Sequence, residues 1–137
     1  MKGGRGGQEW AGVKVGLLIV GEQPYHKIIA WQAADAFAVS VYQVTAGFPD
    51  HEKFGLTSQI RRAATSVALN IVEGQSRATR PDFVRFLAMS RGSIAECAYL
   101  LELCKKLGYI DGAKYDILEP QRKRAAFFLE RMIAALK

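Results

Sequence analysis

The sequence has little of the chemistry that metalloproteins and disulfide-linked proteins need. It contains only two cysteines and two histidines. Cys97 and Cys104 are seven residues apart on one apolar helix face, so their Cα atoms are expected about 10 Å apart, beyond the range of a disulfide. We predict that both are small core residues, as free cysteines usually are. His26 and His51 have no cysteine or carboxylate at ligand spacing, which excludes a zinc site of the usual kind.

Long apolar runs and catalytic motifs are also missing. The apolar run VGLLIVG, residues 15–21, is far shorter than the ~20 residues that span a bilayer, and no A-x-A-like cleavage site follows it. The glycine-rich start lacks the Lys-Ser/Thr ending of a phosphate loop, and no recognisable catalytic motif appears elsewhere. We therefore expect a cytoplasmic protein that is not an enzyme and has no cofactor, metal ion, membrane contact or small-molecule substrate.

The chain is basic, with a formal net charge of +6 and a pI near 9.5. The positive excess lies in residues 56–137. Such a balance favours nucleic acid or another anionic partner, although charge alone is a weak signal.

Helical periodicity organises most of the sequence. Residues 1–24 are rich in glycine and predict a flexible leader, and residues 25–137 form one domain. Helices are predicted over residues 25–45, about 57–73, from 80 to Gly108, and about 112–136, and nothing reads as a strand. Short loops between them predict an all-α fold, an antiparallel up-down four-helix bundle.

Local signals mark the helix ends. Gly74 suits the C-terminal turn of the second helix. Thr79 is the expected N-cap of the third helix, with Pro81 in its first turn. Pro120 falls inside the fourth helix and is expected to kink or split it.

A polar stripe interrupts the apolar second helix at steps of three and four residues, within an arc of about 80°. It consists of Gln59, Arg62, Ser66, Asn70 and Glu73. On the third helix a shoulder formed by Arg85, Met89, Gly92 and Glu96 defines a second packing surface.

Two interpretations of the stripe stay open. It faces water, or it forms a buried network between helices or subunits in which each group finds a partner. In the second case Arg62 pairs with Glu96 or Glu73, and Asn70 bridges backbone and side chain. Glu73 has no histidine or cysteine at helical spacing, so neither interpretation makes the stripe catalytic.

The segments FPDHEKFGLTSQIRRAATSVALNIVEGQSR and DFVRFLAMSRGSIAECAYLLELCKKLGYI resemble a family of small bacterial four-helix-bundle proteins. That family includes the protein encoded in intervening sequences of large-subunit ribosomal RNA genes, and the chain is similar too to the accessory variability determinant of diversity-generating retroelements. The resemblance covers roughly residues 25–137. It implies ring-shaped homopentamers, a stripe that orders the bundle or the ring, and, for the retroelement protein, nucleic-acid binding through a basic surface and partnership with a reverse transcriptase.

Two functions are therefore weighed. The first is a nucleic-acid-binding accessory protein that contacts phosphates without strong sequence preference, because few exposed aromatic side chains are expected for base stacking on the second to fourth helices. The second is an oligomeric protein-binding scaffold whose charges are only a solvated surface. The candidate phosphate contacts are Arg61, Arg77, Arg80, Arg91, Lys106, Lys123, Arg124 and Arg131.

Overall fold

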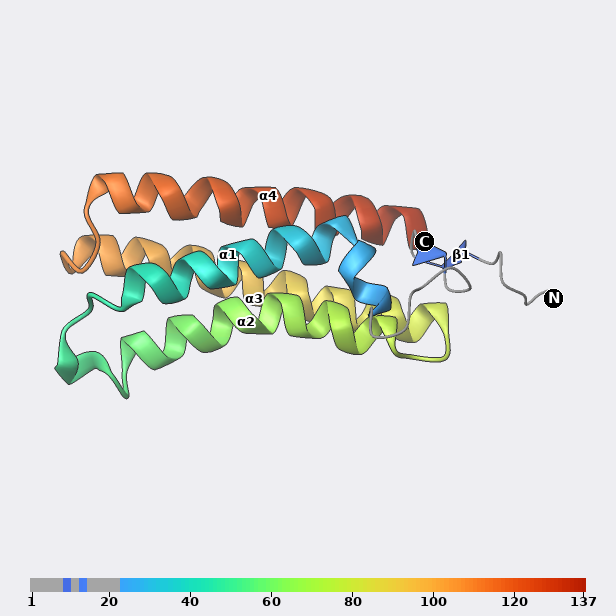
Figure 1. The fold of residues 1–137 in the computed structure, drawn as a ribbon, viewed down its shortest axis with the longest axis horizontal. Helices are drawn as coiled ribbons and strands as arrows, with labels where there is room; N and C mark the ends of the chain where they lie inside the picture. The colour runs from blue at the N-terminus through green and yellow to red at the C-terminus, as the bar shows by residue number, and fades with distance from the viewer. Residues whose placement is uncertain (1–8, 11–12, 15–22) are drawn as a thin grey trace.

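The computed structural model describes residues 9–10, 13–14 and 23–137. Four long helices run antiparallel: α1 (Ile29–Thr45), α2 (Leu56–Gln75), α3 (Arg80–Lys106) and α4 (Gly112–Leu136). Each helix packs against the next, and α4 closes the bundle against α1. The α1–α2 and α3–α4 connections lie at one end, and the α2–α3 turn and the C-terminus lie at the other (Figure 1). The predicted four-helix bundle is confirmed.

The helix α3 begins and ends where the sequence predicts. The Oγ1 atom of Thr79 accepts a hydrogen bond from the Asp82 backbone N–H at 3.2 Å, and Pro81 lies in the first turn. Gly108, with φ of +79°, follows the last turn in the left-handed conformation that glycine adopts most easily.

One predicted helix start is wrong, and of the two effects expected of Pro120 the split is excluded. The first helix starts at Ile29 rather than Tyr25, because Pro24–Lys27 form a separate 3-10 turn, η2. Pro120 does not split α4, which is one continuous helix. Proline deprives the carbonyl of Asp116 of its helical donor, but both residues are exposed, so water can satisfy that carbonyl.

Gly74 does not form a C-terminal turn, because it lies inside α2 and Ser76 is the C-cap. It is buried against the first turns of α3. A Cβ at this position would lie 2.8 Å from Cδ1 of Phe83 and 2.9 Å from Cβ of Phe86. Glycine is therefore needed here for the close approach of two helices.

The core contains both cysteines, as predicted. Cys97 and Cys104 are free and fully buried. Burial raises the pKa of Cys97 to about 12 and that of Cys104 to about 11, since desolvation disfavours the thiolate. Ile117 of α4, by contrast, is 54% exposed.

The predicted leader contains a short pair of strands, β1 (Glu9–Trp10) and β2 (Val13–Lys14), in antiparallel register with Glu9 opposite Lys14. The expectation of no strand is wrong there, because two residues are too short for a period-2 pattern to show. Most of residues 1–24 lie outside the described residues, so a flexible leader stays a prediction. Within the described part of the chain, no helix is both long and apolar enough to cross a membrane.

Candidate nucleic-acid interface

Three of the candidate phosphate contacts share one side of α4. Lys123, Arg124 and Arg131 lie with Phe127 within an arc of about 100°, turned away from the buried Leu129, and we call these four exposed residues the α4 basic face. The Cζ atom of Arg131 lies 5.6 Å from the ring centroid of Phe127. The face therefore combines three cations with an aromatic ring on one rigid helix.

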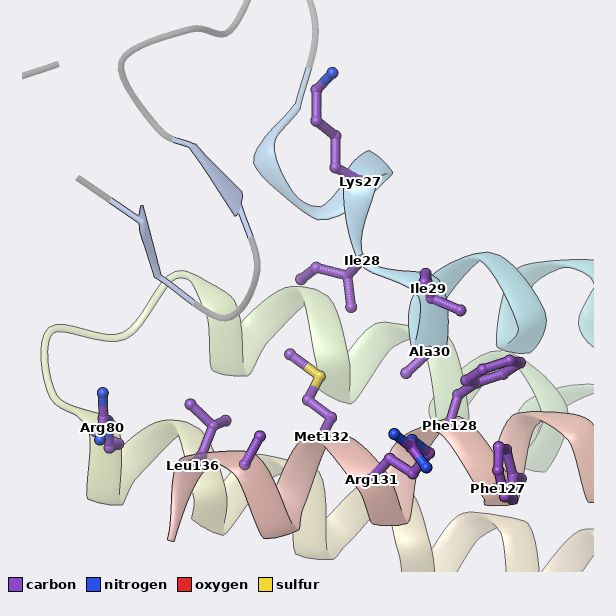
Figure 2. Close-up of a pocket in the computed structure, with 11 residues that line it drawn as sticks. Lys27, Ile28, Ile29, Ala30, Arg80, Phe127, Phe128, Arg131, Met132 and Leu136 are labelled. Carbon is purple, nitrogen blue, oxygen red and sulfur yellow. The ribbon is translucent and has the colours of Figure 1, made fainter. Parts of the chain in front are cut away.

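A hollow of about 710 Å³ adjoins this face where η2 and the start of α1 meet the second half of α4. Its centre is apolar, formed largely by Ile28 and Met132, and three cations lie at its edges (Figure 2). These cations are Lys27, Arg80 and Arg131, and none of the described lining residues is acidic. The fold thus brings Arg80 of α3 and Arg131 of α4 to one site.

Arg91, another candidate, is already paired. Its guanidinium donates two hydrogen bonds to the carboxylate of Glu130, at 2.7 and 2.6 Å, which join α3 to α4. These bonds hold the pKa of Arg91 above and that of Glu130 below its usual range. Arg91 therefore joins α3 to α4, and a phosphate would have to compete with Glu130 for its guanidinium.

Arg61 belongs to a different surface, a hollow of about 450 Å³ between α1 and α2. Its Nε donates to Oγ1 of Thr45 at 2.8 Å, and its Cζ lies 4.5 Å from the ring centroid of Tyr42. We call this site the α1–α2 hollow. It is lined by Tyr42, Lys53, Phe54, Thr57, Ser58, Arg61, Arg62 and Thr65.

The remaining candidates lie elsewhere. The Cζ atom of Arg77 lies 4.5 Å from the ring centroid of Phe86 at the α2–α3 turn, and its Nε is 3.8 Å from a carboxylate oxygen of Asp82. Lys106 ends α3, about 39 Å along the helix from Arg80 at 1.5 Å per residue. The eight candidates therefore form several surfaces, and the densest is at α4.

The centre of the polar stripe forms a network between α2 and α3. The Nδ2 atom of Asn70 donates to the backbone oxygen of Ser66 at 2.9 Å and to its Oγ at 3.0 Å, as the bridging prediction required. The Oγ of Ser66 lies 2.8 Å from the Oγ of Ser93 on α3. The buried Ser90 adds a bond to the backbone oxygen of Val67 at 2.7 Å, which sequence reasoning missed.

The outer members of the stripe are exposed. Within one chain the expected pairing of Arg62 with Glu96 or Glu73 does not form, because Arg62 has no ion pair with any described residue, and pairing across a subunit contact stays a prediction. A Cβ on Gly92 would meet no described residue within 4 Å, so none of the described helices packs closely against this part of the α3 shoulder. The exposed members of the stripe are Gln59, Arg62 and Glu73, and Arg85 and Glu96 of the shoulder on α3 are exposed as well. Whether a second subunit covers them stays a prediction.

Few aromatic side chains are strongly exposed on the second to fourth helices, as expected: among the described residues of α2, α3 and α4 they are Tyr99 (60%) and Phe127 (57%). Phe54, in the segment before α2, is 90% exposed. The sequence carried a signal for Phe127, which is two residues and therefore about 200° away from the core residue Leu129. It carried none for Phe54, because exposure in a loop depends on how the neighbouring helices pack.

Over the described ranges, no cluster of three or more His, Cys, Asp or Glu side chains is placed to hold a metal ion.

Comparison with known proteins assigns the chain to a family. A crystal structure of a protein of unknown function from the S23 ribosomal protein family of Bacteroides thetaiotaomicron VPI-5482 is similar, with a TM-score of 0.72 and 25% sequence identity over 77% of this chain and 96% of that chain. No curated protein matches the sequence. Residues 26–131 match the 23S rRNA-intervening sequence protein family. The match spans most of the four-helix bundle, and the chain belongs to the 23S rRNA-intervening sequence protein family.

Proposed function

We propose that the protein is a non-enzymatic, oligomeric accessory protein that binds RNA or DNA through phosphate contacts. The observation that carries this proposal is the α4 basic face together with Arg80 and Lys27 at the edges of the adjoining hollow. Lys123 and Arg80 make no ion pair with any described residue, so their charges are available to an anion. Lysine and arginine on one face provide the sequence-independent part of nucleic-acid affinity.

The oligomer strengthens the proposal, because a ring repeats the basic face around one assembly. A single chain leaves several large apolar side chains exposed, and burial in a subunit contact would remove them from water. They include Ile29 (55%), Val39 (50%), Leu69 (55%) and Met89 (47%). We propose a ring-shaped homopentamer, which light scattering tests directly, since a 15.1 kDa species at micromolar concentration would contradict it.

Two partners fit an accessory role in the cytoplasm. The family name points to ribosomal RNA, and the resemblance to the accessory variability determinant points to a reverse transcriptase. Neighbouring genes discriminate between them. A reverse transcriptase gene next to this one favours the second, and a position inside a ribosomal RNA gene favours the first.

The direct test is charge reversal on the α4 basic face. Lys123→Glu combined with Arg124→Glu is expected to weaken binding to all single- and double-stranded probes alike and to leave the oligomer intact. Fluorescence titration over a range of salt concentrations measures the loss, and log K for the unchanged protein should fall by about 0.7 to 0.9 per unit of log salt for each phosphate neutralised.

A matched control has the same change of charge elsewhere. Lys105→Glu combined with Lys114→Glu alters two exposed residues at the α3–α4 end of the bundle that are not candidate phosphate contacts, and Lys114 is about 14 Å along α4 from Lys123. Equal weakening by both double variants would show that net charge, not the α4 basic face, determines binding.

The second candidate function is an oligomeric scaffold that binds a protein. Exposed apolar side chains on α3 and α4, such as Tyr99 (60%) and Ile117 (54%), favour it, because protein partners cover such groups. Absence of binding to any nucleic-acid probe at low salt would replace the first proposal with this one.

A further inference from the structure

The α1–α2 hollow combines as many cations as the α4 basic face with a second aromatic ring. Two aromatic rings line it, those of Tyr42 (45% exposed) and Phe54 (90% exposed). Three cations line it as well, Lys53, Arg61 and Arg62. None of the described lining residues is acidic. The hollow therefore offers apolar ring faces and positive charge within about 450 Å³.

The exposure of Phe54 is the unusual feature. Single exposed apolar side chains are common and by themselves mean little. Phe54, however, projects from the segment between η3 (Asp50–Glu52) and α2, and the Nζ of Lys53 lies 5.5 Å from its ring centroid. An aromatic ring beside cations at the mouth of a hollow is how proteins meet unpaired bases of nucleic acid.

The positive charge comes from side chains and not from the helix terminus. The carboxylate of Glu52 accepts the first backbone N–H of α2, that of Leu56, at 3.0 Å, so the N-terminus of α2 is already capped. Arg61 is fixed against Tyr42 and Thr45, whereas Arg62 has no ion pair with any residue in the described part of the chain.

Hydroxyl groups complete the lining. Thr57, Ser58 and Thr65 all line the hollow. Thr57 is 8% exposed, and its Oγ1 has no hydrogen-bond partner among the residues that the structure describes. A bound polar ligand can supply that partner after a side-chain rotation.

We propose that the α1–α2 hollow takes an unpaired base of single-stranded nucleic acid, stacked on Phe54, with the flanking phosphates on Lys53 and Arg62. A nucleotide carries a flat apolar base beside an anionic phosphate, and the hollow offers an aromatic ring to the base and cations to the phosphate. Bases in a duplex stack on each other and are not free to enter, so the site distinguishes single strands from double strands. This inference rests on the proposed nucleic-acid binding and adds a site and a substrate form to it.

A second copy of the chain is the other occupant to consider. A subunit contact over this hollow would remove three like charges from water, and the lining supplies no carboxylate to compensate them. A nucleic acid brings the compensating phosphates with it. Charge complementarity therefore favours the nucleic acid.

The test compares Phe54→Leu with the unchanged protein on three fluorescein-labelled probes of equal length: a single-stranded oligo-dT, the same backbone without bases, and duplex DNA. A base stacked on an aromatic ring is worth about a five-fold to a hundred-fold change in affinity. Phe54→Leu should lose that factor on oligo-dT and nothing on the abasic strand or on duplex DNA. The unchanged protein should bind oligo-dT more tightly than the abasic strand by a similar factor.

Tyr99→Leu is the matched control, because Tyr99 is an exposed aromatic residue on α3 that does not line this hollow. It should bind every probe as the unchanged protein does. If oligo-dT binds to Phe54→Leu as tightly as to the unchanged protein, with normal salt dependence, the stacking site is refuted and phosphate binding stands. Binding of no probe by the unchanged protein refutes both. Dissociation of the oligomer in Phe54→Leu, seen by light scattering, would assign the hollow to a subunit contact and also overturn the inference.

Discussion

Gly74→Ala should destabilise the protein although alanine is the better helix former. In an open helix this change stabilises by about 1 kcal/mol, because alanine loses less backbone entropy on folding. At this position the added methyl carbon would lie 2.8 Å from Cδ1 of Phe83 and 2.9 Å from Cβ of Phe86. Carbon atoms pack without repulsion at about 3.5–4.0 Å, so both contacts require α2 and α3 to move apart.

Overpacking of this kind costs about 1–3 kcal/mol. After subtraction of the helix-propensity gain, Gly74→Ala should be less stable than the unchanged protein by up to about 2 kcal/mol. Gly112→Ala is the control, since a Cβ on this first residue of α4 would meet nothing within 4 Å. It should be neutral or stabilising by up to about 1 kcal/mol.

Urea unfolding followed by far-ultraviolet circular dichroism measures both free energies. The protein concentration must be equal throughout, because subunit association contributes to the stability of an oligomer. If Gly74→Ala gains as much stability as Gly112→Ala, the close approach of α2 to α3 at this glycine is wrong.

Three further predictions concern the core, the polar network and the cap of α2. Cys97 and Cys104, whose pKa values are raised to about 12 and about 11, should not react with a thiol reagent at pH 8 in the native state but should both react in denaturant, and rapid labelling of the native protein would contradict their burial. The stability that their raised pKa values contribute should be present below pH 9.0 and lost as the pH rises toward 11–12. Asn70→Leu should cost about 1–3 kcal/mol in unfolding free energy by removing the donor to Ser66, and unchanged stability and oligomeric state would show that the network contributes nothing. The carboxylate of Glu52 accepts the first backbone N–H of α2, and this hydrogen bond lowers the pKa of Glu52 below the ordinary 4.5. The difference in Tm between the unchanged protein and Glu52→Gln should therefore be constant above about pH 5 and shrink as the pH falls below 4.5. A difference in Tm that does not depend on pH would refute the carboxylate cap.

The sequence predicted features that depend on neighbours in the chain. Thr79 caps α3 because its side chain reaches a backbone N–H three residues away, and Gly108 ends that helix through its own backbone conformation. The two cysteines are buried because helical spacing puts them on the apolar face of α3. The Asn70 bridge to Ser66 spans one turn of α2 and is local as well.

Helical spacing in the sequence could not predict which residues of different helices contact each other. Arg62 was expected to pair with Glu96 or Glu73, but which polar groups meet depends on how α2 and α3 are rotated about their axes, and that rotation brings Ser66 to Ser93 instead. Gly74 looked like a helix end, and only the approach of Phe83 shows why it has no side chain.

What the sequence determined by itself is the fold class, the core faces and the basic balance, because each is a sum or a period along one chain. Only the tertiary structure decided which charges act together. It joins Arg80 and Arg131 at one hollow, pairs Arg91 with Glu130, and leaves Phe54 in the solvent beside Lys53. The reason is physical: a helix period places a residue on a face, whereas the neighbours of that face come from segments distant in sequence, and their positions are set by the packing of the whole bundle.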